Sequence, residues 1–289
     1  MTPPMVQHRF LPHPTTTKAS QLTTPSPESL ADGLSWTQLS TGIVEVRIDR
    51  PHARNAMSVA VFNGLTEAWR RVHVDESVQV VILTSSDCGT FCAGMDLKEA
   101  TALKAREGRD ITDFITDPFQ RAMRSVRVPL IAAMTGSFTA GGMMLSLNCD
   151  VRVGLSGTKG GIAEAKVGRG SPWAMPLLWM LPQAVLMEMT LTGEFIPIER
   201  LHELGFVNHI ADTPDAVRAK ALELAKRIAA NAPLSVRAGK ASILRAAAVG
   251  VEDGLDEATR IYSNVYSSDD AQEGMRAFAE KRAPRWTAR

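Results

Sequence analysis

The stretch "PLIAAMTGSFTAGGMM", from Pro129 to Met144, decides the fold because it joins a strand, a turn and a helix without one charged residue. The apolar run Leu130–Met134 is typical of a strand buried on both faces. The pair Gly141–Gly142 then opens an apolar helix. The first N–H groups of a helix have no acceptor within it, and the helix dipole favours negative charge there. We therefore expect this turn to receive a negatively charged oxygen.

A second buried strand ends in a similar turn. The run "VQVVILTSS" (Val78–Ser86) leads directly into "DCGTFCAGMD" (Asp87–Asp96). Two such turns side by side present free backbone N–H groups, and two convergent N–H donors suit the developing oxyanion of an enolate or a tetrahedral adduct. Glycine is expected at these turns because a Cβ atom would block the close approach of a ligand.

Strands and helices alternate through the rest of the first two hundred or so residues. The alternating stretch "GIVEVRIDRP" predicts a strand with one buried face, and Ser58 is a suitable N-cap for the helix that follows. The segment "CDVRVG" predicts a further short strand. Helical segments are expected around Leu97–Ala105 and Ile111–Val126. This order indicates an α/β core built of repeated strand–helix units.

The two ends of the chain differ from this core. Residues 1–27 are rich in Pro and Thr and contain no acidic residue, so we predict a disordered N-terminal tail over residues 1–34. After about Gly205 the sequence becomes almost wholly helical in pattern. We therefore divide the rest into a core over 35–225 and a helical subdomain over 226–289. So small a helical subdomain buries little by itself, and it should pack on the core, on another subunit or on both.

Composition excludes several classes of function. The 289-residue chain is 45% hydrophobic, which is ample for a core, and its net charge of +1 argues against a nucleic-acid partner. Three cysteines without a CxxC pair argue against a disulfide framework and against a metal site. The uncharged stretches are broken by Gly or Pro, so no membrane span is expected. We predict a soluble cytoplasmic protein.

Six segments together resemble the enoyl-CoA hydratase/isomerase (crotonase) superfamily over residues 36–289. In order they are "RPHARNAMS", "FCAGMDLKE", "AGGMMLSLNCDVRV", "GIAEAKVG", "LTGEFIPIERLHELGFVNHI" and "EGMRAFAEKRAPRW". The resemblance implies a crotonase-like spiral of β-β-α units. It also implies an acyl-CoA substrate, a homotrimer or hexamer held by the helical subdomain, and no cofactor beyond the coenzyme A of the substrate itself.

The same resemblance assigns roles to individual residues. The backbone N–H groups of Met95 and Gly141 match the family's oxyanion hole, which holds the thioester oxygen. Glu164 matches a catalytic glutamate of the family, whereas Met144 stands where hydratases of the family carry a second one. The expected CoA-binding residues are Arg54, Asn55, Ala93, Lys98 and Lys281, the last with Arg282 reaching a neighbouring subunit's CoA. Met144, Trp173 and Met175 are expected to line an apolar acyl pocket.

Three functions fit this site. A single glutamate is enough for an isomerase, which takes a proton from C2 of a 3-enoyl-CoA and returns it at C4. A hydratase is the first alternative, if Glu164 works with a water held by backbone or by another side chain. The second alternative is a non-catalytic acyl-CoA-binding protein, which Met144 favours and the retained Glu164 and Gly141 oppose. Pro172 stands where dienoyl isomerases and dehalogenases of the superfamily have an Asp, which disfavours both activities.

Overall fold

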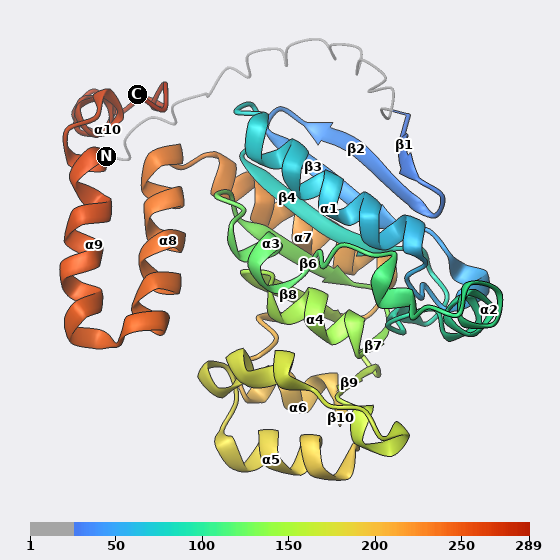
Figure 1. Cartoon of the computed structure of the whole chain (residues 1–289). Coiled ribbons are helices and arrows are strands. Elements are labelled where there is room, and N and C mark those ends of the chain that lie inside the picture. Colours follow the sequence, from blue (N-terminus) through green and yellow to red (C-terminus); the bar gives the residue numbers. More distant parts are fainter. Residues whose placement is uncertain (1–25) are drawn as a thin grey trace, which may run out of the picture.

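The centre of the structure is a sheet of seven strands in the order β1-β2-β3-β4-β6-β8-β11 (Figure 1). The computed structural model describes residues 26–289. Strands β3, β4, β6, β8 and β11 run parallel, and β1 and β2 extend the sheet in antiparallel pairing. The strands are Glu28–Ala31 (β1), Leu34–Ser40 (β2), Ile43–Ile48 (β3), Val80–Ser85 (β4), Leu130–Met134 (β6), Val151–Leu155 (β8) and His209–Ala211 (β11). The predicted strands are confirmed as β3, β4, β6 and β8, but β3 was predicted to have one buried face and is buried on both.

A second, smaller sheet has the order β10-β9-β7-β5. Its strands are Thr90–Cys92 (β5), Ser137–Thr139 (β7), Lys159–Gly161 (β9) and Ile196–Pro197 (β10). Strands β5, β7 and β9 run parallel to one another. Each follows directly in sequence on β4, β6 or β8 of the large sheet, so successive parts of the chain place one strand in each sheet.

Helices complete these units. The pair β4–β5 is followed by α2 (Leu97–Glu107), and β6–β7 is followed by α4 (Gly141–Leu147). The pair β8–β9 leads through two 3-10 helices, η3 (Glu164–Val167) and η4 (Pro172–Trp179), to α5 (Gln183–Thr192). The repetition is a spiral of β-β-α units, and the predicted α/β fold class is confirmed.

Alternate residues of β4 point to opposite faces of the large sheet, and each face is covered. Val81 and Leu83 belong to the larger apolar core, which also contains the buried face of α1 (Val59–Val74). Ile82 belongs to a second core against α7 (Pro214–Ala229). Helix α1 begins where the sequence predicted, because the Ser58 hydroxyl accepts a hydrogen bond from the N–H of Val61 at 3.3 Å.

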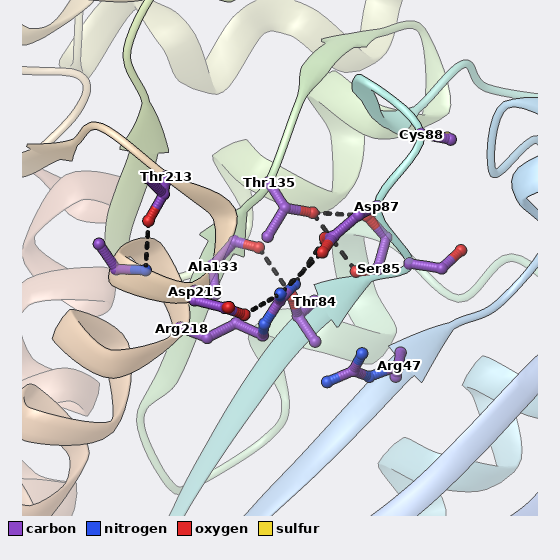
Figure 2. A network of polar contacts seen from close by, with 12 residues as sticks. Arg47, Thr84, Ser85, Asp87, Cys88, Ala133, Thr135, Thr213, Asp215 and Arg218 are labelled. Atoms are coloured by element: carbon purple, nitrogen blue, oxygen red, sulfur yellow. Dashed lines mark hydrogen bonds and ion pairs between the residues drawn. The ribbon is translucent and has the colours of Figure 1, made fainter.

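Polar contacts fix the loop between β4 and β5 to α7 (Figure 2). The Arg218 guanidinium donates to both oxygens of Asp87 at 2.7 and 2.8 Å and to Asp215 at 2.6 Å. At the adjoining strand ends, the hydroxyls of Ser85 and Thr135 are 3.2 Å apart. The chain that enters β5, and then the predicted oxyanion turn, is therefore anchored on its α7 side.

The predicted helical segment Ile111–Val126 is interrupted in the structure. It contains only a 3-10 turn, η2 (Ile111–Asp113), and a short helix, α3 (Gln120–Arg124). Pro118 explains the gap because the residue before a proline is disfavoured in the α conformation. The side chain of Asn63 holds the intervening backbone by bonding the carbonyl of Phe114 and the N–H of Thr116.

Two of the predicted boundaries are wrong. Strand β1 lies inside the tail that was predicted to extend to residue 34, while residues 1–25 lie outside the described part of the chain. The boundary between 225 and 226 falls inside α7, whose residues up to Ala225 pack on the sheet. The change to a separate helical layer comes instead at Pro233, where α8 begins.

The C-terminal helices form a layer beside the core (Figure 1). They are α8 (Pro233–Val249), α9 (Val251–Tyr266) and α10 (Asp269–Ala279), and α8 packs along α9. An ion pair of 2.8 Å between Lys240 and Asp150 ties α8 to the start of β8. The remaining elements are η1 (Pro51–Ala53) and α6 (Ile198–Glu203). None of the helices in residues 26–289 combines the length and apolarity that crossing a membrane requires.

Candidate active site

The two glycine turns lie side by side, as the sequence predicted. Strands β5 and β7 are parallel neighbours, and each ends in one of the turns. A Cβ atom on Gly94 would lie 3.2 Å from the backbone nitrogen of Gly141 and 2.8 Å from the Cβ atom of Ala140. Gly94 has a φ of 94°, a conformation that L side chains rarely adopt. The small-sheet register therefore brings the turn at Met95 against the start of α4.

The N–H groups of Met95 and Gly141 are both available to a ligand. An isolated parallel bridge joins Met57 to Met95, in which Met57 N–H donates to the Gly94 carbonyl at 2.7 Å and the Met57 carbonyl accepts from Asp96 N–H at 3.0 Å. Within residues 26–289, no acceptor is found for Met95 N–H or for Gly141 N–H. Two neighbouring free donors at a helix start can hold an oxyanion.

Packing inside the chain also requires the two glycines. A Cβ atom on Gly142 would run into the Cys92 carbonyl oxygen, which is backbone and cannot move aside. A Cβ atom on Gly141 would overlap the methyl group at the end of the Met57 side chain and lie 3.2 Å from the Cα atom of Gly94. The sequence interpretation attributed glycine at 141 to the approach of a ligand. The structure adds a second reason, which is the close packing of Met57 and Gly94 against residue 141.

The turn that carries Met95 is fixed from its C-terminal side. Asp96 is the N-cap of α2 and accepts from the N–H groups of Lys98 and Glu99 at 3.1 and 3.2 Å. The same carboxylate forms a 3.0 Å ion pair with Arg50, and both side chains are largely buried. Because burial and a charge-assisted contact combine here, the ion pair restrains the turn more than a surface pair would.

Glu164 is the titratable group suited to proton transfer. It opens η3, three residues after β9, and its carboxyl is half-buried. Its Oε2 atom is buried and has no hydrogen-bond partner among residues 26–289. Burial raises the pKa of the Glu164 carboxyl, and backbone N–H groups and the Trp173 side chain only partly oppose this effect. A carboxylate with a raised pKa and a free oxygen is a good general base.

The apolar side chains predicted for the acyl pocket differ in their burial. Met144, Met95 and Trp173 are partly buried and pack against the larger core. The Trp173 carbonyl accepts a 2.8 Å bond from the Gln120 amide, which fixes the start of η4. Met175 is 50% exposed, because η4 turns Ala174 and Leu177 inward instead. That Met175 lines an apolar acyl pocket stays a prediction.

The predicted CoA-binding residues fall into three groups. Ala93 lies in the turn before Gly94, and Lys98 is exposed on the first turn of α2 beside it. Arg54 is exposed at the end of η1, with a φ of 52°. Lys281 follows α10, which Figure 1 shows on the opposite side of the molecule from α2, so one chain does not bring it to Lys98. Its neighbour Arg282 is paired with Glu273 and Glu280.

Asn55 requires a correction. It is completely buried, and its amide donates to the carbonyls of Ser86 and Thr90 at 2.9 and 2.7 Å. Its Oδ1 atom accepts from the N–H of Arg50 and the hydroxyl of Ser86. This geometry contradicts a direct contact between the Asn55 side chain and CoA. Its role is to join the loop before β5 to the loop before α1.

Sequence reasoning missed Met57, because an apolar side chain in "RNAMS" has no chemical signature of its own. It also missed the pairing of Arg50 with Asp96, since the two lie far apart in sequence. As for metals, the described residues contain no group of three or more His, Cys, Asp or Glu side chains that could hold an ion.

Comparison with known proteins identifies relatives of this chain. The profile of the enoyl-CoA hydratase/isomerase family matches residues 38–289. The chain is 37% identical to the enoyl-CoA hydratase EchA19 of Mycobacterium tuberculosis over 84% of this chain and 92% of that protein. It is 32% identical to the (E)-benzylidenesuccinyl-CoA hydratase of Thauera aromatica over 86% and 96%. A crystal structure of an enoyl-CoA hydratase from M. tuberculosis superposes with a TM-score of 0.78 at 38% identity, covering 89% and 99%.

Proposed function

The chain belongs to the enoyl-CoA hydratase/isomerase family and is a crotonase-type enzyme acting on CoA thioesters, and within that family we propose that it interconverts 3-enoyl-CoA and 2-enoyl-CoA. The observation that carries the proposal is the asymmetry of the site. Glu164 is half-buried with a free oxygen, whereas the family's second catalytic position is the apolar Met144. One base and an oxyanion hole suffice for a double-bond shift.

The proposed reaction uses one proton. The Glu164 carboxylate removes a proton from C2 of the 3-enoyl thioester, and the electron pair moves through C1 to the thioester oxygen. The N–H groups of Met95 and Gly141 hold that oxygen as the dienolate forms. The dienolate then takes the same proton from Glu164 at C4, the C2–C3 double bond forms and the carboxylate is regenerated. Apolar neighbours help, because they exclude water and keep the carboxylate poorly solvated and basic.

Hydration is the second candidate, and two observations favour it. Both relatives named above are called hydratases. The free Oε2 atom of Glu164 could also orient a water against C3 of a 2-enoyl-CoA. The reaction would need another group to complete the water's hydrogen bonds, because Met144 cannot.

The test compares Glu164→Gln with the wild type. The substitution keeps the shape of the side chain and removes its basicity, so turnover should fall at least ~10²-fold while acyl-CoA affinity changes little. Two spectrophotometric assays identify the reaction: 3-hexenoyl-CoA gains conjugated enoyl absorbance on isomerisation, and crotonyl-CoA loses it on hydration. Glu188→Gln, on the exposed side of α5, is the matched control. Unchanged turnover in Glu164→Gln would remove Glu164 from the mechanism.

We also propose that the chain assembles as a homotrimer or a hexamer. Support comes from large apolar side chains that α8, α9 and α10 expose in the single chain. They are Ile243, Leu255, Tyr266, Met275 and Phe278, the last 88% exposed. Such an apolar face is typical of a subunit contact. In an assembly of this kind Lys281 would approach the CoA of a neighbouring subunit.

A further inference from the structure

We infer that Met57 is a positioning residue that fixes the two oxyanion N–H groups relative to each other, through its backbone at the turn of Met95 and through its methyl group at Gly141. The inference deepens the proposed function, and it rests on that proposal only in taking the N–H groups of Met95 and Gly141 to bind the thioester oxygen. It assigns a role to a residue that has no polar side-chain group and no place in the proton transfer.

The backbone of Met57 determines where Met95 lies. Its N–H and C=O bond the two residues on either side of Met95, at 2.7 Å to the Gly94 carbonyl and 3.0 Å from the Asp96 N–H. These two bonds leave the Met95 N–H directed away from Met57 and without an acceptor in residues 26–289. The orientation of the first oxyanion donor is therefore set by Met57.

The backbone of Met57 is itself immobilised on both sides. Two residues before it, the buried Asn55 amide bonds the carbonyls of Ser86 and Thr90. Directly after it, Ser58 caps α1. A segment held at both ends in this way has little freedom to move. If a substitution disturbs the contacts of Met57, the turns that carry Met95 and Gly141 should therefore shift and the backbone of Met57 should not.

The side chain of Met57 determines how near Gly141 can come. It is fully buried in the larger core, and its methyl group lies close enough to the start of α4 to overlap a Cβ atom on residue 141. The methyl group thus fills the space between Met57 and the start of α4. Methionine suits such an irregular gap because its chain is unbranched and flexible. Backbone bonds to one turn and a side-chain contact to the other connect both donors to one residue.

The placement matters because oxyanion donors act only at hydrogen-bond distance from the developing charge. A displacement of some tenths of an ångström at one donor weakens its bond to the enolate more than its bond to the ground-state carbonyl, which lowers kcat before it lowers binding. The conformation of Gly141 does not by itself demand glycine, since its φ is not positive. A Cβ atom at 141 would overlap the Met57 methyl group, so a larger residue there must displace that methyl group within the core as well as press on the backbone of Gly94.

A double-mutant cycle of Met57→Ala and Gly141→Ala tests this. Gly141→Ala alone should lower kcat/KM by about 10²-fold, because the new methyl group meets the buried Met57 side chain. Met57→Ala alone should lower it by roughly 10-fold through loosened donors. In the double variant the alanine at 141 enters the space that Met57 vacates, so kcat/KM should recover at least ~10-fold relative to Gly141→Ala. Met57→Leu, of similar volume, should stay close to the wild type.

A spectroscopic readout separates positioning from general damage to the core. A bound enoyl-CoA with a dimethylamino-aryl group absorbs at longer wavelength when its thioester carbonyl is polarised, and the shift should shrink in each single variant and return in the double variant. Met123→Ala, which removes another fully buried methionine, is the control. It should lower the melting temperature as Met57→Ala does and leave the shift intact.

The two hypotheses can fail separately. The absorbance shift needs only the two N–H donors, so the cycle is also run in the Glu164→Gln background, where it remains readable even if isomerisation is the wrong reaction. Additive effects of the two substitutions on kcat/KM and on the shift would overturn the role of Met57. An absorbance shift of the bound probe in Met57→Ala that equals the wild-type shift would also overturn the role of Met57.

Discussion

Replacing Met144 with glutamate should convert this site toward hydration. Met144 lies on α4, three residues after Gly141, and it packs against the core together with Met95 and Trp173. Helix α4 contacts η4, whose Trp173 lies beside the Glu164 carboxyl. With position 144 facing the substrate, as the family resemblance implies, a carboxyl there would give the site a second acid/base group. Two nearby carboxyls repel each other when both are ionised, so one carboxyl stays protonated while the other is ionised. Addition of water requires this combination of an acid and a base.

The size of the effect follows from the surroundings of residue 144. An added acid/base partner is worth about 10²–10⁴ in rate, which sets the upper limit of the gain in crotonyl-CoA hydration. Met143 and Leu145 on either side are fully buried. Placing a carboxyl at the partly buried position between them should therefore cost about 1–3 kcal/mol of stability. For a chain of this length that lowers the melting temperature by roughly 2–10 °C.

The assay measures crotonyl-CoA hydration and 3-hexenoyl-CoA isomerisation in the same preparations, together with the melting temperature. Met144→Gln is the matched control, since it adds a polar group of the same shape that can neither donate nor remove a proton in the reaction. Hydration should rise in Met144→Glu and not in Met144→Gln, and isomerisation should fall or hold. A wild type that already hydrates rapidly, or a stable Met144→Glu that gains nothing, would refute the reasoning.

Two further predictions concern pH and assembly. Burial raises the pKa of Glu164, so wild-type kcat/KM should increase with pH through an apparent pKa above that of an ordinary glutamate, and a profile with an ordinary acid limb would contradict the assignment. The pH dependence of stability has the matching sign. Because the pKa of Glu164 is higher in the folded state, the folded state is favoured at pH below the unfolded-state pKa, and this benefit is lost as the pH rises. Glu164→Gln should therefore gain in melting temperature over wild type from acid to neutral pH. Light scattering on the purified protein should give three or six times the 31.3 kDa chain mass, whereas a monomer would leave the exposed apolar face of α8–α10 unexplained.

The sequence was most informative where physical constraints are local. Uncharged apolar runs identified β4 and β6, and Ser58 identified the start of α1, because burial and capping act over a few residues. The interrupted segment Ile111–Val126 shows the limit of periodicity, since Pro118 and the distant Asn63 determine that loop. The tail boundary failed for a similar reason: β1 exists only because β2 pairs with it.

The site was predictable in its backbone and less so in its side chains. Gly141 and Glu164 stand in motifs whose spacing implies chemistry. Asn55 stands in such a motif too, yet its partners Ser86 and Thr90 lie more than thirty residues away, so sequence could not show that its amide is fully occupied. The exposure of Met175 could not be predicted from its apolar character, because the turn of η4 that exposes it depends on which neighbours face the core.

This division between backbone and side chains bears on how such a site can change its reaction. The enolate is to be held by two N–H groups, which every residue except proline possesses, so position 95 can be methionine without loss of the donor. In the proposed mechanism the side chains at 144 and 164 decide where protons go, and exchanging them should leave the oxyanion hole in place. What the hole does require is its spacing, which depends on Gly142 against the Cys92 carbonyl and on Met57 against Gly141. Substitutions at 144 should therefore redirect catalysis, whereas shortening the side chain at 57 should weaken every reaction that passes through the enolate.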